Sequence, residues 1–112
     1  MTGERRAVRV VPKRAITVAI DDHGIPRAYG VVANISESGA CVLTNGAFQV
    51  GEHLLVQLSF AREPAPVETS GRVVWTETTR DRGVSRYGLQ WSEVDISKRV
   101  HLKTLIGATA AR

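Results

Sequence analysis

The sequence has little of what several functional classes require. One cysteine, Cys41, stands among 112 residues, so no disulfide can form within the chain. The three histidines are scattered without the spacing of metal ligands, and we expect no metal site. A Walker loop, a nucleophile elbow and a pair of carboxylates that the pattern places together are all missing. These absences argue against an enzyme, and we expect no cofactor.

Long apolar runs are missing as well. No stretch approaches the roughly 18 apolar residues of a membrane span. The first ten residues are charged and do not resemble a signal peptide, and neither end carries a lipidation signature. A single cysteine also fits a reducing compartment. We therefore expect a soluble, cytoplasmic protein without membrane contact.

The charge is mildly basic, with a net value of +4, but it is unevenly distributed. Five basic residues lie within the first 14 positions, against the single acid Glu4: Arg5, Arg6, Arg9, Lys13 and Arg14. Such an arm suits a phosphate-bearing partner, and it equally suits a solvated tail. Composition alone leaves both interpretations open.

Most of the chain alternates apolar and polar residues with a period of two, which is typical of β-strands. The pattern predicts six strands, at residues 16–20, 29–35, 40–44, 54–60, 67–78 and 86–91. It places Val73 and Trp75 on one face of their strand and Val74 on the other. Asn45-Gly46 is a strong turn signal.

The last segment changes to helical spacing. Ser92 to Asp95 resembles a capping box, and Gly107 is a plausible helix end. We expect a single domain over residues 1–112, with a flexible basic arm at 1–14, a mostly antiparallel barrel at 15–91 and a C-terminal helix at 92–108.

Two short motifs stand out against this background. Residues 5–9 read R-x-x-x-R, with Arg6 as an extra cation, and residues 34–39 read N-x-S-x-x-G. Further on come Gly71-Arg-Val-Val-Trp75 and Tyr87-Gly-Leu-Gln-Trp91. In this order and spacing, from about Glu4 to about Gly107, they resemble the PilZ family.

The resemblance implies a six-stranded antiparallel β-barrel with a C-terminal α-helix, and the bacterial second messenger cyclic di-GMP as ligand. It carries over Arg5 and Arg9 as the paired arginines, and Asn34, Ser36 and Gly39 as the second motif. The ligand would lie between the arm and the barrel surface. Outputs would be motility, exopolysaccharide production, biofilm or virulence control, through a partner protein of that machinery.

The residue chemistry agrees with such a ligand. An arginine fork donates in pairs to phosphate oxygens or to guanine O6 and N7, and its plane stacks on a base. Asn34 and Ser36 are two apart, so an extended strand places them on one face. Asn34 stands where the family can have Asp, and a neutral amide pairs less strongly with guanine. Trp75 could stack on a base if its strand faces the arm.

Two other functions remain alternatives. One is a PilZ-like adaptor that binds protein without ligand, although such members typically lack the arginine pair. The other is a small basic barrel that binds nucleic acid, which the aromatic content of 5% and the position of the charge at one end disfavour. The pattern does not distinguish a monomer from a dimer.

Overall fold

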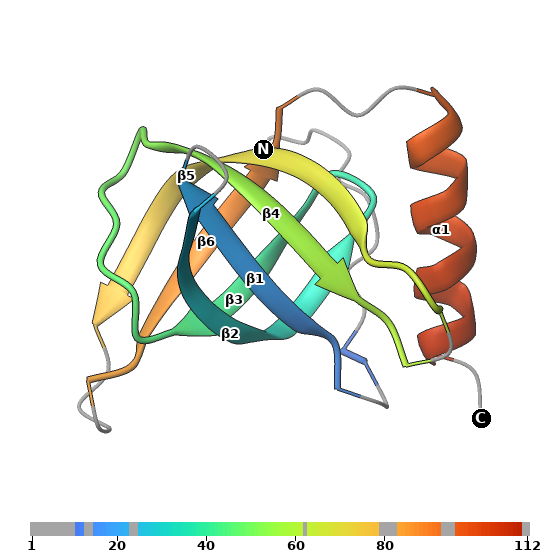
Figure 1. Ribbon diagram of the computed structural model, residues 1–112, viewed down its shortest axis with the longest axis horizontal. Helices are drawn as coiled ribbons and strands as arrows, with labels where there is room; N and C mark the ends of the chain where they lie inside the picture. The colour runs from blue at the N-terminus through green and yellow to red at the C-terminus, as the bar shows by residue number, and fades with distance from the viewer. Residues whose placement is uncertain are drawn as a thin grey trace, which may run out of the picture.

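The computed structural model describes residues 11–12, 15–22, 25–61, 63–78, 83–92 and 96–110. These residues form six strands followed by one helix (Figure 1). The elements are β1 (Thr17–Asp22), β2 (Ile25–Ser36), β3 (Gly39–Thr44), β4 (His53–Ser59), β5 (Val67–Thr78), β6 (Ser85–Trp91) and α1 (Ile96–Ala110).

The strands close into a barrel in the order β1-β2-β3-β6-β5-β4, with every neighbouring pair antiparallel. This confirms the predicted six-stranded barrel with a C-terminal helix. Alternate side chains point inward, as the buried Leu54, Val56 and Leu58 of β4 show. Burial of these branched side chains drives closure, because each removes apolar surface from water.

Two β-bulges, one in β2 and one in β5, break the alternation of inward and outward side chains and so change which residues face the outer surface. One lies in β2 between Val32 and Asn34, and the other in β5 between Val73 and Trp75. An extra residue in a bulge turns the following side chains to the opposite face. Val73 is therefore fully buried, whereas Trp75 is 42% exposed. The prediction that these two residues share a face was wrong, because it assumed an unbroken period of two.

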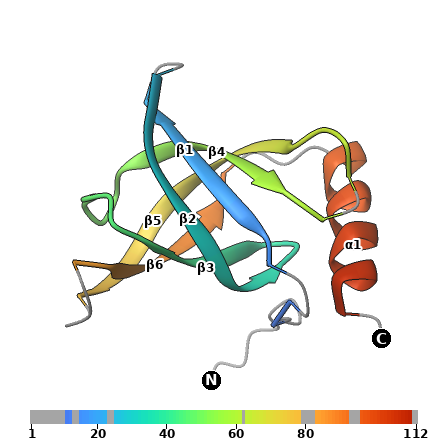
Figure 2. The ribbon, with the colours of Figure 1, turned by 60° about the horizontal axis from the view of Figure 1, so that its bottom comes forward.

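Helix α1 stands against one end of the barrel, on the side of the turn between β2 and β3 (Figures 1 and 2). Its inward side chains Leu102, Leu105 and Ile106 are buried in the same core as the barrel residues. Ser92 precedes the helix, and the rest of the predicted capping box lies outside the described residues. Gly107 does not end the helix. Its φ is not positive, and helix-favouring alanines follow it, so the last turn continues to Ala110.

The opposite end of the barrel is closed by the loop of residues 45–52. The chain bends at Asn45, where the sequence carries the turn signal, and β4 begins only at His53, with the positive φ of 96° at Gly51. Between these points the chain folds back so that Phe48 is buried and meets Tyr87 edge to face, with ring centroids 5.4 Å apart. Core packing explains this loop conformation, because burial of the Phe48 ring removes a large apolar surface from water.

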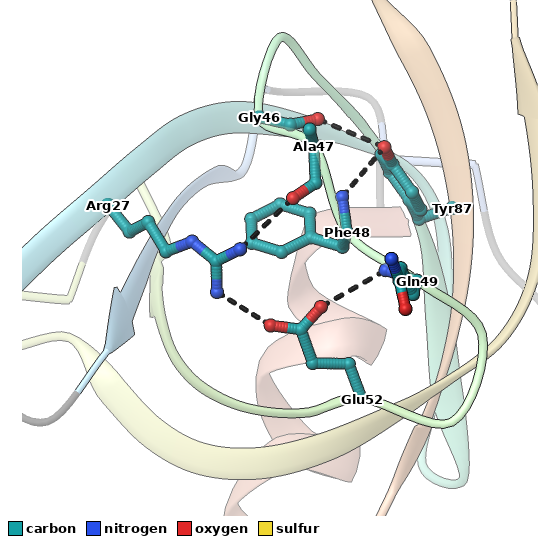
Figure 3. Close-up of polar contacts among 7 residues, drawn as sticks. All are labelled: Arg27, Gly46, Ala47, Phe48, Gln49, Glu52 and Tyr87. Atoms are coloured by element: carbon teal, nitrogen blue, oxygen red, sulfur yellow. Dashed lines mark hydrogen bonds and ion pairs between the residues drawn. The ribbon is translucent and has the colours of Figure 1, made fainter.

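Polar contacts fix this loop in place (Figure 3). The Tyr87 hydroxyl donates to the Gly46 carbonyl at 3.0 Å and accepts from the Phe48 N–H at 3.2 Å. Arg27 of β2 forms an ion pair with Glu52 at 2.6 Å, donates to the Ala47 carbonyl at 3.1 Å, and lies 4.7 Å above the Phe48 ring. We call this loop, with Arg27 and Tyr87, the closed end of the barrel.

Candidate ligand-binding site

The second motif lies at the hairpin that joins β2 to β3. Asn34 pairs with Cys41 and Ser36 pairs with Gly39, with Glu37 and Ser38 forming the turn between the strands. By strand alternation, Asn34 and Ser36 lie on the side of β2 opposite the buried Ile35, although only Asn34 is partly exposed there. Asn34 and Ser36 thus come from one face, and the bulge ahead of Asn34 is what turns it outward.

Ser36 is used within the turn itself. Its hydroxyl accepts from the Ser38 N–H at 3.1 Å, lies 3.0 Å from the Ser38 hydroxyl, and is only 1% exposed. Its carbonyl accepts from the indole N–H of Trp91 at 3.2 Å. A serine that caps its own turn in this way sets the backbone shape. Ser36 therefore shapes the surface, while Asn34 is half-buried at its edge.

Gly39 is required by the barrel. A Cβ on Gly39 would lie 2.1 Å from the Leu89 carbonyl oxygen of the adjacent strand. Its φ is not positive, so the reason for glycine is close approach of β6 rather than a left-handed turn. The sequence motif identified this position, but the contact that demands it lies 50 residues further along the chain.

A row of residues crosses four strands beside the motif. Asn34 pairs with Cys41, Cys41 with Gly88, and Gly88 with Trp75. The buried Cys41 and the glycine leave a low floor between the two larger side chains. The result is a surface pocket of about 280 Å³, lined by Asn34, Ala40, Cys41, Val74, Trp75, Gly88 and Leu89. We call it the Trp75 pocket.

Trp75 and Gly88 form a matched pair in this pocket. A Cβ on Gly88 would lie 2.1 Å from the Trp75 indole nitrogen, so the ring rests directly on the glycine backbone. Part of the indole stays exposed to solvent. Sequence reasoning named Trp75 but missed Cys41 and Gly88 as the floor. Only the cross-strand register brings these residues together, and no local pattern signals it.

The arginine motif cannot be placed beside this surface. Arg5, Arg6 and Arg9 lie outside the described residues, so their part in the site stays a prediction. Among the residues that are described, no group of three His, Cys, Asp or Glu side chains could hold a metal ion. No helix in the described part of the chain has the length and apolar character that crossing a membrane requires.

Comparison with solved structures shows the same fold elsewhere. The PilZ domain of Escherichia coli YcgR with c-di-GMP superposes with a TM-score of 0.75 at 12% identity, covering 96% of this chain and 92% of that one. Bacillus subtilis MotI/DgrA, an inhibitor of motility, gives 0.73 at 22% identity, covering 96% and 51%. A longer YcgR chain in complex with c-di-GMP gives 0.75 at 11% identity, covering 93% and 45%.

The chain thus spans about half the length of MotI and of the longer YcgR chain. No protein of curated function matches the sequence. The family model described as the PilZ domain matches residues 4–108, which is nearly the whole chain. Together with the closed barrel and its C-terminal helix, this match shows that the chain belongs to the PilZ domain family.

Proposed function

We propose that this chain is a cyclic di-GMP receptor that acts on a partner protein and catalyses no reaction. The dinucleotide binds between the arginines of the N-terminal arm and the outer face of β2, β3, β6 and β5. The observation that carries the proposal is the row from Asn34 to Trp75, which forms a pocket directly beside the motif turn.

The Trp75 pocket suits a flat, polar-edged base. The partly exposed indole offers a face for stacking, and such base–aromatic contacts contribute about 1–3 kcal/mol each. Across the low floor, the side chain of Asn34 carries one carbonyl and one amide group. A guanine edge presents both donors and acceptors, so an amide can pair with it. The pocket therefore combines stacking on one side with hydrogen bonding on the other.

The arginines supply what this pocket lacks. Two phosphodiester groups need positive charge, and the described lining of the Trp75 pocket contains none. Arg5 and Arg9, with Arg6 between them, provide guanidinium forks that bind phosphate oxygens in pairs. In the proposed mechanism, ligand binding orders the arm across the barrel and so creates or hides a surface for the partner.

The output fits the control of motility or exopolysaccharide production. MotI, which shares the fold, is an inhibitor of motility, and this supports a motility partner. We expect the receptor in the cytoplasm, because a nucleotide second messenger acts there.

The direct test is isothermal titration of cyclic di-GMP into the wild type and into Arg5→Ala/Arg9→Ala. We expect a micromolar or tighter dissociation constant, about −8 kcal/mol or better, and its loss in the variant. Lys98→Ala/Lys103→Ala is the matched control, because it removes the same charge from exposed positions on α1. Absence of binding to the wild type would overturn the proposal and favour a protein-binding adaptor.

Competition separates a receptor from a nucleic-acid barrel. A receptor prefers cyclic di-GMP over GMP and over a single-stranded oligonucleotide of equal charge. A nucleic-acid binder would show a steep salt dependence and little preference for the dinucleotide. That second result would contradict the proposal.

The role of Trp75 is tested through its neighbour. Gly88→Ala places a methyl group where the indole lies, so the ring must move while its chemistry is unchanged. We expect this variant and Trp75→Ala to weaken binding of cyclic di-GMP about five-fold or more, as loss of one stacking contact predicts. Trp75→Phe keeps an aromatic face and should retain most of the affinity. Equal affinities in all four proteins would exclude stacking on Trp75.

A further inference from the structure

A second pocket lies on the other side of the motif turn. It has a volume of about 320 Å³ and is lined by Glu37, Ser38, Gln90, Trp91, Ser92 and Arg99. The turn contributes Glu37 and Ser38, the end of β6 contributes Gln90 to Ser92, and α1 contributes Arg99. We call it the Arg99 pocket. Residues of both the barrel and the helix therefore line this pocket.

The two pockets are close neighbours. Gln90 lines the Arg99 pocket and Gly88 lines the Trp75 pocket, and the two residues are two positions apart on β6. Two residues along a strand span about 7 Å. Gly39, which pairs with Gln90, and Cys41, which pairs with Gly88, continue both rows onto β3. One small ligand of dinucleotide size can therefore reach both pockets.

The Arg99 pocket carries a charge of each sign. Glu37 is half-buried and Arg99 is exposed, so a carboxylate and a guanidinium border the same space. A phosphate there would meet repulsion from Glu37 as well as attraction to Arg99. A guanine base satisfies both groups. Its O6 and N7 accept from an arginine fork, and its N1–H and N2–H₂ groups donate to a carboxylate.

We propose that the Arg99 pocket receives a guanine base of the dinucleotide, with Arg99 on its O6 and N7 atoms and Glu37 on its N1–H and N2–H₂ groups. This inference rests on the proposed function and deepens it. A ligand held in this way bridges the β2–β3 turn and α1. Binding therefore fastens the helix to the barrel, which gives the signal a route from the ligand to the C-terminal element.

The test is isothermal titration of cyclic di-GMP into the wild type, Arg99→Ala, Arg99→Lys, Glu37→Gln and the control Lys98→Ala. Lys98 is the adjacent cation of α1 and does not line the pocket. We expect Arg99→Ala to lower the affinity about ten-fold or more, the range for one bidentate contact to guanine. Arg99→Lys keeps the charge without the fork and should fall between Arg99→Ala and the wild type.

An inosine analogue of the dinucleotide, which lacks the N2 amino group, tests Glu37. Glu37→Gln turns an amide toward that amino group, so we expect the preference for the guanine compound over the analogue to narrow about five-fold. Amide hydrogen exchange gives a readout that a merely structural role would not move. The ligand should slow exchange in α1 of the wild type and leave it unchanged in Arg99→Ala.

The outcomes separate the two claims. If the wild type does not bind cyclic di-GMP, the proposed function fails and this inference fails with it. If the wild type binds while Arg99→Ala and Glu37→Gln bind equally well, the receptor function stands and the Arg99 pocket is overturned. A loss as large in Lys98→Ala would also overturn it, because the effect would then reflect general charge.

Discussion

The two ends of the barrel share one kind of turn, in which a buried hydroxyl accepts a hydrogen bond from the N–H two residues further on, but the chain that follows the turn differs. At the motif turn, the Ser36 hydroxyl accepts from the N–H two residues on, at 3.1 Å. Where β3 enters the closed end, the Thr44 hydroxyl accepts from the Gly46 N–H, also at 3.1 Å. Both hydroxyl residues are buried. In each case a short polar side chain ends a strand by replacing a ladder hydrogen bond.

The two ends differ in the segment that comes after the hydroxyl residue. Beyond Thr44 the chain forms a loop whose polar groups find partners within the protein, through Tyr87, Arg27 and Glu52. Beyond Ser36 the turn is only two residues long, and its residues line a pocket open to solvent. One end uses its polar groups to hold the fold together. The other presents them to a ligand, and the two roles can be separated by mutation.

Phe48→Ala should have the largest effect on stability. Removing a buried aromatic side chain from the closed end lowers the free energy of unfolding by about 3–5 kcal/mol. Urea denaturation followed by circular dichroism measures the change, with Val50→Ala, an exposed residue of the same loop, as the control. Affinity for cyclic di-GMP in the folded variant should equal that of the wild type. A marked loss of affinity would show that the two ends are coupled.

Ser36→Ala and Thr44→Val form a matched pair with an intermediate effect. Each removes a buried hydroxyl that a backbone N–H needs, so each should lower the free energy of unfolding by about 1–3 kcal/mol. Only Ser36→Ala should also weaken ligand binding, because its turn carries Glu37 and Ser38. Denaturation and titration of both variants test this, and equal losses of affinity would contradict the division between the ends.

Glu52→Gln should have the smallest effect, and it depends on pH. The hydrogen bonds from Arg27 and from the Gln49 N–H hold the pKa of Glu52 below its ordinary value of 4.5. Because the pKa of Glu52 is lower in the folded protein than in the unfolded chain, ionised Glu52 stabilises the fold at pH values above 4.5. This contribution is lost as the pH falls through the pKa of Glu52 in the folded protein. Both side chains are about one-third exposed, at 36% and 29%, so the contribution is at most about 1 kcal/mol.

Unfolding free energies of the wild type and Glu52→Gln, measured between acid and neutral pH, check this expectation. The difference should be constant at neutral pH and shrink below pH 4.5. A difference that grew toward acid pH would mean that the ion pair with Arg27 is not the cause.

The strands could be predicted because their burial follows a simple alternation, and β5 was predicted with the bounds that the structure gives. The bulge before Trp75 could not be predicted, because an extra residue in one strand is defined only by its partner. The extent of the closed-end loop, between the strands predicted at 40–44 and 54–60, could also be predicted from the sequence. Its conformation could not, because the contact of Phe48 with Tyr87 that fixes it is 39 residues distant in sequence.

The candidate site, like the fold, could be predicted from the sequence only in part. The motif positions Asn34, Ser36 and Gly39 were named from the sequence, but the reasons for Ser36 and Gly39 are internal packing and turn shape. Cys41 and Arg99 belong to no motif, and the motif that contains Gly88 did not indicate a role in the site. They become part of a surface only through strand register and the docking of α1, which a single sequence does not encode locally.

Barrel closure also limits how a partner protein can be recognised. Every strand of the described barrel has a paired neighbour on both sides, so the sheet has no edge strand, and only the ends of strands, such as residues 25–29 of β2 and 74–78 of β5, pair on one side alone. A partner that added a strand by backbone pairing, the route by which many signalling domains capture extended peptides, would have only these short strand ends to pair with. Over the rest of the barrel, recognition depends on side chains of the outer face or of α1, and its specificity can therefore change through surface substitutions that leave the barrel intact.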